Sequence, residues 1–359
     1  MFSDFFLKSF RILLLPFAFL YWLAIAVRNW LYDKNIFRSS SFGLPLICVG
    51  NLSVGGTGKS PMVEYLVRLL KNQFKVATLS RGYKRKTRGY ALAGPAATAL
   101  EIGDEPMQFH IKFPEVPVAV GEERLEAIPQ LLHDRPETEV IILDDAFQHR
   151  SVKAGMNILL TDYHNLFTRD FYLPTGDLRD LKSGYKRAQI IVVTKCNPSI
   201  TADEKQKIIK EINPQPGQQV FFTSIEYGEV YHILDRKQTS LSENTEVLLV
   251  SGIANPRPLE RLLEKYCRSY HIMPYSDHHI FTIDDLKDIR KKFSNLEAEN
   301  KIILTTEKDA VRLVKFNTEM ADWPIYVIPV RHHFLFGEGE KFNQAVINYI
   351  QAFQKSGKK

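Results

Sequence analysis

The sequence predicts an α/β protein with a mostly parallel sheet covered by helices on both faces, a smaller second α/β lobe, and an N-terminal membrane-associated helix. Three observations predict it. From Ser39 onward, apolar runs of strand length alternate with segments whose apolar residues recur at helical spacing, as in βα units. This alternation weakens between about 226 and 245 and then resumes. An uncharged apolar run precedes it, at 12–27.

Length, charge and cysteine content bound the possible functions. A chain of 359 residues is long enough for two packed domains. Its net charge of +6 and isoelectric point near 9.0 favour an anionic partner: a nucleotide, a nucleic acid, an acidic membrane face or a phosphorylated substrate. Cys48, Cys196 and Cys267 are too widely spaced for a disulfide framework or a metal knuckle, so we expect a reducing, cytoplasmic location.

The segment 1–38 is predicted to be an N-terminal membrane-anchor helix. Its apolar run at 12–27 has about 16 residues, whereas crossing a bilayer core takes ~20, so we expect insertion into one face of the membrane. A cleaved signal peptide and a buried core helix are the alternatives. The flanking side chains suit a membrane interface and its anionic headgroups: Tyr21, Trp22, Trp30, Tyr32, Lys8, Arg11, Arg28, Lys34 and Arg38.

The rest of the chain is predicted to form a larger domain at 39–225, a linker at 226–245 and a smaller C-terminal α/β domain at 246–359 that closes a cleft. The expected strands of the larger domain are 46–49, 76–79, 116–120, 140–143, 157–161, 190–194 and 220–223. A short strand is expected at 230–234, and the smaller domain should contain 247–251, 272–275, 302–305 and 325–328.

A glycine-rich turn follows the first of these strands and leads into a helix. Small residues there let backbone N–H groups converge on phosphate oxygens, Lys59 would reach the β- and γ-phosphates, and Ser60 would ligate Mg²⁺. Ser53 stands where the usual phosphate-binding loop has glycine, so this loop is a variant. The turn predicts a P-loop NTPase-like domain whose nucleotide is held by Ser53, Val54, Gly55, Gly56, Thr57, Gly58, Lys59 and Ser60.

Two carboxylates, Asp144 and Asp145, end the strand at 140–143. In a P-loop protein, a carboxylate in this place approaches the Mg²⁺ that the loop hydroxyl holds. Neighbouring strand residues point to opposite faces, so one of the pair should face the metal; we choose Asp145, with Asp144 as the alternate ligand. Gln148 is a candidate for positioning water or phosphate, and His149 for capping the turn.

A basic segment at 81–88 follows the second strand, at the carboxyl edge where open α/β sheets bind ligands. It is either a solvated loop or a site for an anionic group of the substrate, and it contains Arg81 and Tyr83.

Asp104 also has two possible roles. It either caps the helix that begins near Pro106, or takes the proton of an attacking hydroxyl as a general base.

The run Asp277-His278-His279 ends a strand of the smaller domain. A metal site would need further converging ligands, so a histidine paired with a catalytic carboxylate across the cleft is the better hypothesis. Another strand ends at Lys195-Cys196-Asn197, where guanine recognition would require a carboxylate in place of Asn197. The sequence therefore favours adenine over guanine as the base of the bound nucleotide.

Together these segments resemble one known family, the tetraacyldisaccharide 4′-kinases, which are the lipid A 4′-kinases of Gram-negative bacteria. The matching pieces occur in family order over nearly the whole chain. They are the apolar anchor, Gly50-Asn51-Leu52-Ser53-Val54-Gly55-Gly56-Thr57-Gly58-Lys59-Ser60, Ser80-Arg81-Gly82-Tyr83, Gly103-Asp104-Glu105-Pro106, Asp144-Asp145-Ala146-Phe147-Gln148-His149, Leu173-Pro174-Thr175-Gly176-Asp177-Leu178-Arg179, Asp277-His278-His279 and Thr306-Glu307-Lys308-Asp309-Ala310.

The resemblance implies an enzyme that uses ATP and Mg²⁺ to phosphorylate the 4′-hydroxyl of a tetraacylated glucosamine disaccharide 1-phosphate at the cytoplasmic face of the inner membrane. It implies that Asp104 is the base and His278 its partner, with Lys59 and Ser60 at the phosphates and Asp145 at Mg²⁺. The candidate residues for the acylated lipid substrate are Arg81, Tyr83, Gln148 and Arg179. We expect a monomer that binds a membrane surface and no nucleic acid.

Two other functions compete with this one. A membrane-attached P-loop NTPase switch would hydrolyse nucleotide and act on a protein partner, but Asn197 and the lack of an evident switch threonine argue against it. A basic nucleic-acid-binding or membrane-surface protein with a vestigial nucleotide site would not need Lys59, Ser60 and the paired aspartates, and no stacking-aromatic RNA motif is visible.

Overall fold

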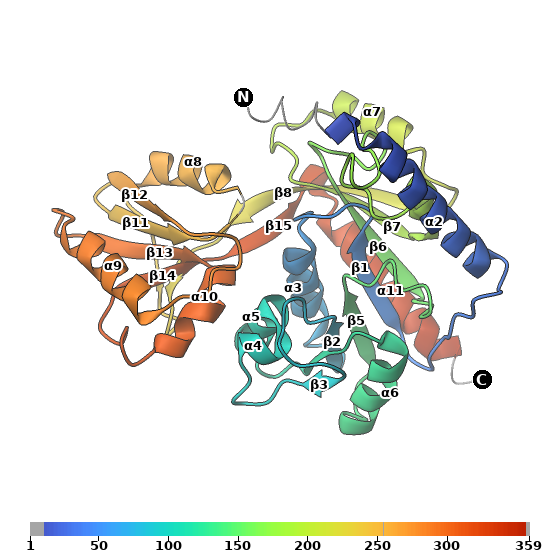
Figure 1. Ribbon diagram of the computed structural model, residues 1–359, viewed down its shortest axis with the longest axis horizontal. Helices are drawn as coiled ribbons and strands as arrows, with labels where there is room; N and C mark the ends of the chain where they lie inside the picture. The colour runs from blue at the N-terminus through green and yellow to red at the C-terminus, as the bar shows by residue number, and fades with distance from the viewer. Residues whose placement is uncertain (1–10, 254, 357–359) are drawn as a thin grey trace.

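Two α/β lobes, with a pair of strands running between them, make up the part of the chain that the computed structural model describes, residues 11–253 and 255–356 (Figure 1). Residues 1–10 of the predicted membrane anchor lie outside this range. The predicted α/β class, with a large and mostly parallel sheet, is confirmed.

The larger lobe contains a nine-stranded sheet in the order β15-β8-β7-β6-β1-β5-β2-β4-β3. Neighbours from β8 to β4 are parallel, and only the edge strands β15 and β3 run antiparallel to theirs. Parallel strands end at a common edge, so the loops after β1, β2 and β5 meet there. The strands are β1 Leu46–Asn51, β2 Val76–Ser80, β3 Ala91–Leu92, β4 Val118–Val120, β5 Val140–Asp144, β6 Met156–Asp162, β7 Ile190–Thr194, β8 Gln219–Tyr227 and β15 Val330–Phe334.

Helices cover both faces of this sheet, so its central strands are buried on both sides. One apolar layer joins α3 and α11 to the sheet, and the other joins α6 and α7. The helical segments of this lobe are α2 Leu15–Asp33, α3 Lys59–Leu70, α4 Ala99–Ile102, α5 Asp104–Lys112, α6 Arg124–Asp134, η1 Lys182–Arg187, α7 Ala202–Ile212, η3 Leu335–Gly337 and α11 Gly339–Ser356.

The smaller lobe repeats the βα construction around a six-stranded sheet in the order β10-β9-β14-β13-β11-β12. Strands β14, β13, β11 and β12 are parallel, and the short β9 and β10 are antiparallel. Two apolar layers lie on its faces. The elements are β9 Val230–His232, β10 Gln238–Thr239, β11 Glu246–Ser251, α8 Arg257–Tyr266, β12 Ser269–Pro274, α9 Ile283–Ser294, β13 Lys301–Thr306, α10 Glu307–Leu313, η2 Val314–Phe316 and β14 Ile325–Ile328.

The chain leaves the larger lobe along β8 and returns to it along β15 (Figure 1). The two strands pair antiparallel, from Val330 opposite Tyr227 to Phe334 opposite Thr223. Helix α11 then buries Phe342 and other apolar side chains in the core of the larger lobe. Residues 330–356 therefore belong to the larger lobe, whereas the expected boundary placed all of 246–359 in the smaller one.

The expected linker at 226–245 also differs from the structure. It contains β9 and β10, which extend one edge of the smaller sheet. The reason for both differences is the same: the apolar pattern of a short strand identifies the strand but does not say which sheet provides its hydrogen-bonding neighbour.

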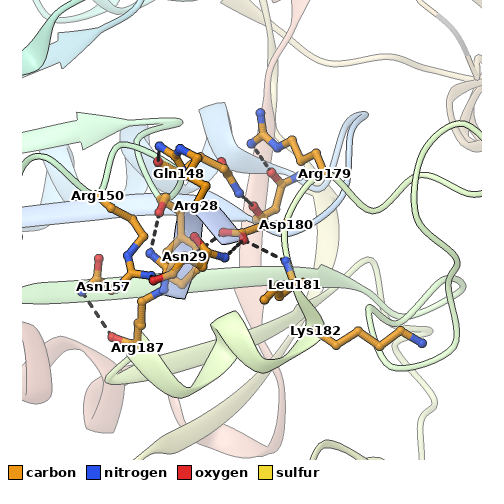
Figure 2. Close-up of polar contacts among 12 residues, drawn as sticks. Arg28, Asn29, Gln148, Arg150, Asn157, Arg179, Asp180, Leu181, Lys182 and Arg187 are labelled. Carbon is orange, nitrogen blue, oxygen red and sulfur yellow. Dashed lines mark hydrogen bonds and ion pairs between the residues drawn. The ribbon is translucent and has the colours of Figure 1, made fainter. Parts of the chain in front are cut away.

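Helix α2 lies against the larger lobe on one side and is exposed on the other. On the docked side, Asn29 Nδ2 donates to Asp180 Oδ1 at 2.7 Å and Arg28 Nη2 donates to the Gln148 carbonyl at 2.9 Å (Figure 2). Within the described residues, no helix combines the length and apolar character needed to cross a bilayer. The outer side of α2 presents large apolar side chains, each at least 43% exposed: Leu15, Phe17, Phe19, Leu20, Leu23, Val27 and Trp30.

A buried histidine connects β15 to the glycine-rich turn. His332 Nε2 lies 2.9 Å from the Gly58 carbonyl oxygen, which can only accept, so Nε2 carries the proton. Nδ1 then accepts from the Thr223 hydroxyl at 2.9 Å. Burial lowers the pKa of His332 to about 4, although the bond to Gly58 partly opposes this. The histidine is therefore neutral in the folded protein.

We predict that this neutral histidine makes the protein less stable in acid. Because folding lowers its pKa from 6.5 to about 4, the unfolded chain takes up the proton first as the pH falls. Between those two values the free energy of unfolding should fall by up to ~3 kcal/mol from this group. Denaturant unfolding at pH 7 and pH 5 should show a smaller loss for His332→Gln than for the wild type. The control is His333→Gln, which changes the exposed neighbouring histidine. An equal loss of unfolding free energy in the wild type and both variants would refute the lowered pKa of His332.

Candidate active site

The glycine-rich turn connects β1 to α3 in the geometry of a phosphate-binding loop. Gly55 and Gly58 have φ of 99° and 85°, a left-handed conformation that glycine adopts without strain. A side chain at Gly58 would also meet His332 Cε1 at 3.0 Å. Neither a capping side chain nor an acidic residue occupies the first turn of α3, so its free N–H groups and positive end are available to an anion.

A cavity of about 640 Å³ opens above this turn, and both lobes line it. The larger lobe contributes the turn, the segment after β2 and the carboxylates after β5, as expected for loops at the carboxyl edge of a parallel sheet. The smaller lobe contributes side chains from the β12–α9 loop and from α10. The lining residues used below are Lys59, Ser60, Arg81, Tyr83, Glu105, Asp144, Asp145, Arg179, Asp277, His278 and Lys308.

The two aspartates at the end of β5, Asp144 and Asp145, have opposite electrostatic environments. Burial and the neighbouring charge of Asp145 raise the pKa of Asp144 to about 7. Burial alone would raise the pKa of Asp145 too, but Lys59 at 3.7 Å and the bonds from Arg179, one of them 3.1 Å long, lower it. Burial in turn lowers the pKa of Lys59. Asp145 is thus already paired with Lys59 and Arg179, whereas Asp144 forms no ion pair with any residue that the structure describes.

The Asp144 carboxylate has the properties of an open cation site. Among residues 11–253 and 255–356, its buried Oδ1 has no hydrogen-bond partner, and its Oδ2 receives only a 3.4 Å contact from the Ser80 hydroxyl. A buried carboxylate oxygen without a partner is unfavourable, and a hard divalent cation would satisfy it. The residues present therefore fit Mg²⁺. Asp144 offers the free oxygen, while Asp145 would have to share its carboxylate with Lys59 and Arg179.

The smaller lobe brings a histidine to the carboxylate of Asp104. His278 Nδ1 lies 2.7 Å from Asp104 Oδ2, and Asp104 is 6% exposed. Asp104 is the first residue of α5, whose cap is Gly103, so the carboxylate does not cap the helix. It is free to pair with His278 and with Arg312, whose Nε donates to Oδ1 at 2.8 Å.

The other residues predicted for the site divide into two groups. Arg81, Tyr83 and Arg179 line the cavity, as do the loop residues from Val54 to Ser60. Ser53 and Gln148 do not. The Ser53 backbone pairs with Leu178. Gln148 Nε2 donates to the Asn51 carbonyl at 2.8 Å, so this side chain supports the beginning of the glycine-rich turn.

Three residues of the site were missed by sequence reasoning: Lys308, Arg312 and His332. The first two follow β13 directly, and a strand end with basic residues four apart in a helix was a usable signal. His332 gave no comparable signal, because it lies in a short strand that follows β14 after a single proline.

A hydroxyl that accepts a phosphoryl group has to lose its proton, so transfer to a hydroxyl needs a base beside the phosphates. The Asp104–His278 pair can take that proton, and its histidine lines the cavity that contains the phosphate-binding loop. The larger lobe with this cavity therefore has the construction of a P-loop kinase.

Comparison with known proteins specifies the class. The family model described as tetraacyldisaccharide-1-P 4′-kinase matches residues 10–351, and the chain belongs to this family. The resemblance seen in the sequence is confirmed. Membership in this family makes the protein a kinase.

Curated relatives match over nearly their full length. A tetraacyldisaccharide 4′-kinase of Bacteroides thetaiotaomicron is 45% identical over 353 residues, covering 94% of this chain and 93% of that protein. One of Flavobacterium johnsoniae is 44% identical over 342 residues, covering 95% and 97%. The crystal structure of LpxK from Aquifex aeolicus in complex with ATP has a TM-score of 0.73 and 29% identity, and covers 95% of this chain and 99% of that one.

We predict that Asp144 provides the metal dependence of nucleotide binding. Wild-type protein should bind ATP more tightly with Mg²⁺ than without it, and Asp144→Asn should reduce this gain at least ~10-fold because the uncompensated carboxylate is gone. In the wild type the gain should increase from pH 6 to pH 8, since the charged form of a group with a pKa of about 7 binds the cation. Equilibrium binding of ATP measures both effects.

The control for this experiment is Asp162→Asn. Asp162 also ends a strand of the large sheet but pairs with Lys195 at 2.7 Å, away from the cavity lining. An Asp144→Asn protein that keeps the full gain from Mg²⁺ would exclude Asp144 as the ligand.

Proposed function

We propose that this kinase transfers the γ-phosphate of ATP to the 4′-hydroxyl of a tetraacylated glucosamine disaccharide 1-phosphate, a step of lipid A biosynthesis. The observation that supports this most directly is the shared cavity. Its floor is a phosphate-binding loop, and its wall includes a histidine bonded to a buried carboxylate. The proposal extends to this chain the substrate named by its family and relatives.

In the proposed reaction, ATP lies along the loop with its phosphates toward the N-terminus of α3. Lys59 and Arg179 neutralise charge as it develops on the transferred phosphoryl group; both already lie beside Asp145, so they face that position. Ser60 and Asp144, with Asp145, would hold Mg²⁺, which supplies further charge neutralisation at the phosphates.

The acceptor hydroxyl enters from the side of the smaller lobe. Its oxygen forms a bond to the γ-phosphorus while the bond from that phosphorus to the bridging oxygen of ADP breaks. The hydroxyl proton passes to the Asp104 carboxylate, which His278 orients. Arg81 and Tyr83 line the same cavity and are candidates for contacting the sugar or its phosphate. All these groups come from one chain, so we also propose that a monomer is active.

We further propose that α2 attaches the enzyme to the cytoplasmic face of the inner membrane, inserted in the interface without spanning. Its outer apolar side chains form a continuous side of the helix, and its inner side is bonded to the larger lobe (Figure 2). A large exposed apolar surface is costly in water and favourable at an acyl boundary. The arrangement brings an acylated substrate and the cavity to the same surface.

Transfer of labelled γ-phosphate from ATP to the acylated disaccharide in mixed micelles tests the reaction. Wild-type protein should form product. Lys59→Ala should lose at least ~100-fold in rate through lost charge stabilisation, and Asp104→Asn ~10²- to 10⁴-fold through loss of the base. Lys71→Ala, at the far end of α3, should remain active. No product from the wild type, or hydrolysis of ATP unaffected by the acceptor, would contradict the proposal and favour an NTPase switch.

Flotation with vesicles containing anionic lipids tests the membrane attachment. Phe17 and Leu20 are 61% and 60% exposed on α2, and each large apolar side chain transferred to the interface contributes ~1.5–3 kcal/mol. Phe17→Glu and Leu20→Glu should therefore each weaken binding at least ~10-fold. Tyr266→Glu places the same charge on an exposed aromatic of α8 in the smaller lobe and should bind like the wild type. Unchanged flotation of both α2 variants would refute the attachment.

A further inference from the structure

Helix α10 directs two cations at the Asp104–His278 pair. Lys308 and Arg312 are four residues apart, so they lie on the same side of the helix, one turn from each other. That side faces the beginning of α5, where Asp104 is located. Neither cation belongs to the nucleotide-binding loop, and nothing in the reaction described above uses them.

Arg312 binds Asp104 in a bidentate arrangement, through two nitrogens on one edge of its guanidinium group. Nε donates to Oδ1 at 2.8 Å, and Nη2 donates to Oδ2. Nη1 donates to the carbonyl of His279 at 3.0 Å. The two-pronged geometry fixes the plane of the carboxylate, which a lysine in the same place could not do. The third bond ties the histidine-bearing loop to the same guanidinium group.

Lys308 determines which nitrogen of His278 carries the proton. Its Nζ lies 2.7 Å from Asp277 Oδ1 and 3.1 Å from His278 Nε2. An ammonium group only donates, so Nε2 must accept and the ring proton must be on Nδ1. Nδ1 then donates to Asp104 Oδ2, at 2.7 Å. Arg312 Nη2 lies 2.7 Å from Nδ1 because both donate to the same carboxylate oxygen.

The backbone of His278 has an uncommon conformation for a residue other than glycine. Its φ is 64°, in the left-handed region that few residues other than glycine occupy. Burial and then the Lys308 ammonium lower the pKa of His278, whereas Asp277 and Glu105 oppose them. The charged groups around the ring are Asp104 and Glu105 of α5, Lys84, Asp277, Lys308 and Arg312.

We propose that Lys308 and Arg312 are positioning residues of the phosphoryl transfer: Arg312 holds the carboxylate of Asp104 in one orientation, and Lys308 keeps the proton of His278 on Nδ1. Neither touches the reacting atoms. With both in place, the imidazole is neutral, its Nδ1–H orients the carboxylate, and Asp104 remains ionised and ready to accept the hydroxyl proton. The kinetic part of this inference rests on the proposed function.

Removal of the Lys308 charge is the sharper kinetic test, because the Lys308 side chain is 27% exposed and its ion-pair partner Asp277 is nearly half-exposed. In Lys308→Gln, kcat should fall at least ~10-fold while KM for ATP stays near the wild-type value. The acid limb of the kcat/KM profile should also move to higher pH, since the cation that lowers the pKa of His278 is gone. Lys315→Gln, just after α10, removes an equal charge away from the pair and should change neither.

Arg312 is tested by the conservative change. Arg312→Lys keeps the charge but not the two-pronged bond, so kcat should fall although thermal unfolding shows a folded protein. Wild-type kcat and an unshifted pH profile in Lys308→Gln, or wild-type kcat in Arg312→Lys, would overturn the positioning role.

A measurement without substrate separates this inference from the proposed function. The ¹⁵N shifts of the His278 ring, assigned by comparison with His278→Gln, report the tautomer in the protein alone. Wild type should have the proton on Nδ1, and Lys308→Gln should shift toward a mixture of tautomers. A proton on Nε2 in the wild type overturns the assignment even if the kinase assay succeeds. If the kinase assay fails and the shifts agree, the proposed acceptor is wrong and the geometry is not.

Discussion

The buried charge of Asp104 is the constraint that joins the two lobes. Removing a carboxylate from water costs several kcal/mol unless partners compensate for it, and here the main partner, Arg312, comes from the other lobe. Asp104 begins α5, and Lys112 at the other end of α5 is also bound by charged partners. It pairs with Glu64 of α3 at 2.5 Å and with Glu307 of α10. Because α5 is held to α10 at both ends, separating the lobes would leave several buried charges without partners.

The phosphate-binding loop likewise depends on segments distant in the chain. His332, on the strand that returns from the smaller lobe, supports Gly58. Arg179 bonds both Asp145 and Asn51, and its own carbonyl accepts from Tyr21 of α2 at 3.4 Å. The phosphate-binding loop is therefore in contact with the strand that returns from the smaller lobe through one histidine, and with the N-terminal helix through one arginine. The phosphate-binding loop, the strand that returns from the smaller lobe and helix α2 are therefore joined by hydrogen bonds and ion pairs.

Local pattern predicted the fold class and the phosphate site because both depend on short-range rules. Alternating strand and helix patterns lead to a parallel sheet, and a glycine-rich turn between strand and helix leads to converging N–H groups. The assignment of elements to lobes could not be predicted in this way. Only Pro329 separates β14 from β15, yet these two strands belong to different sheets. β15 joins the sheet of the larger lobe because it forms hydrogen bonds with β8, about a hundred residues earlier in the chain.

The sequence by itself determined which chemical groups stand at the ends of the strands: a lysine and a hydroxyl after β1, two carboxylates after β5, and histidines after β12. Only the tertiary structure decided how they are used. It left Asp144 with a free oxygen and Asp145 paired, and it gave Asp104 a guanidinium partner 208 residues away instead of a role as a helix cap. The physical reason is that burial and charge pairing set the protonation and orientation of these groups, and both depend on which distant surfaces the fold brings together.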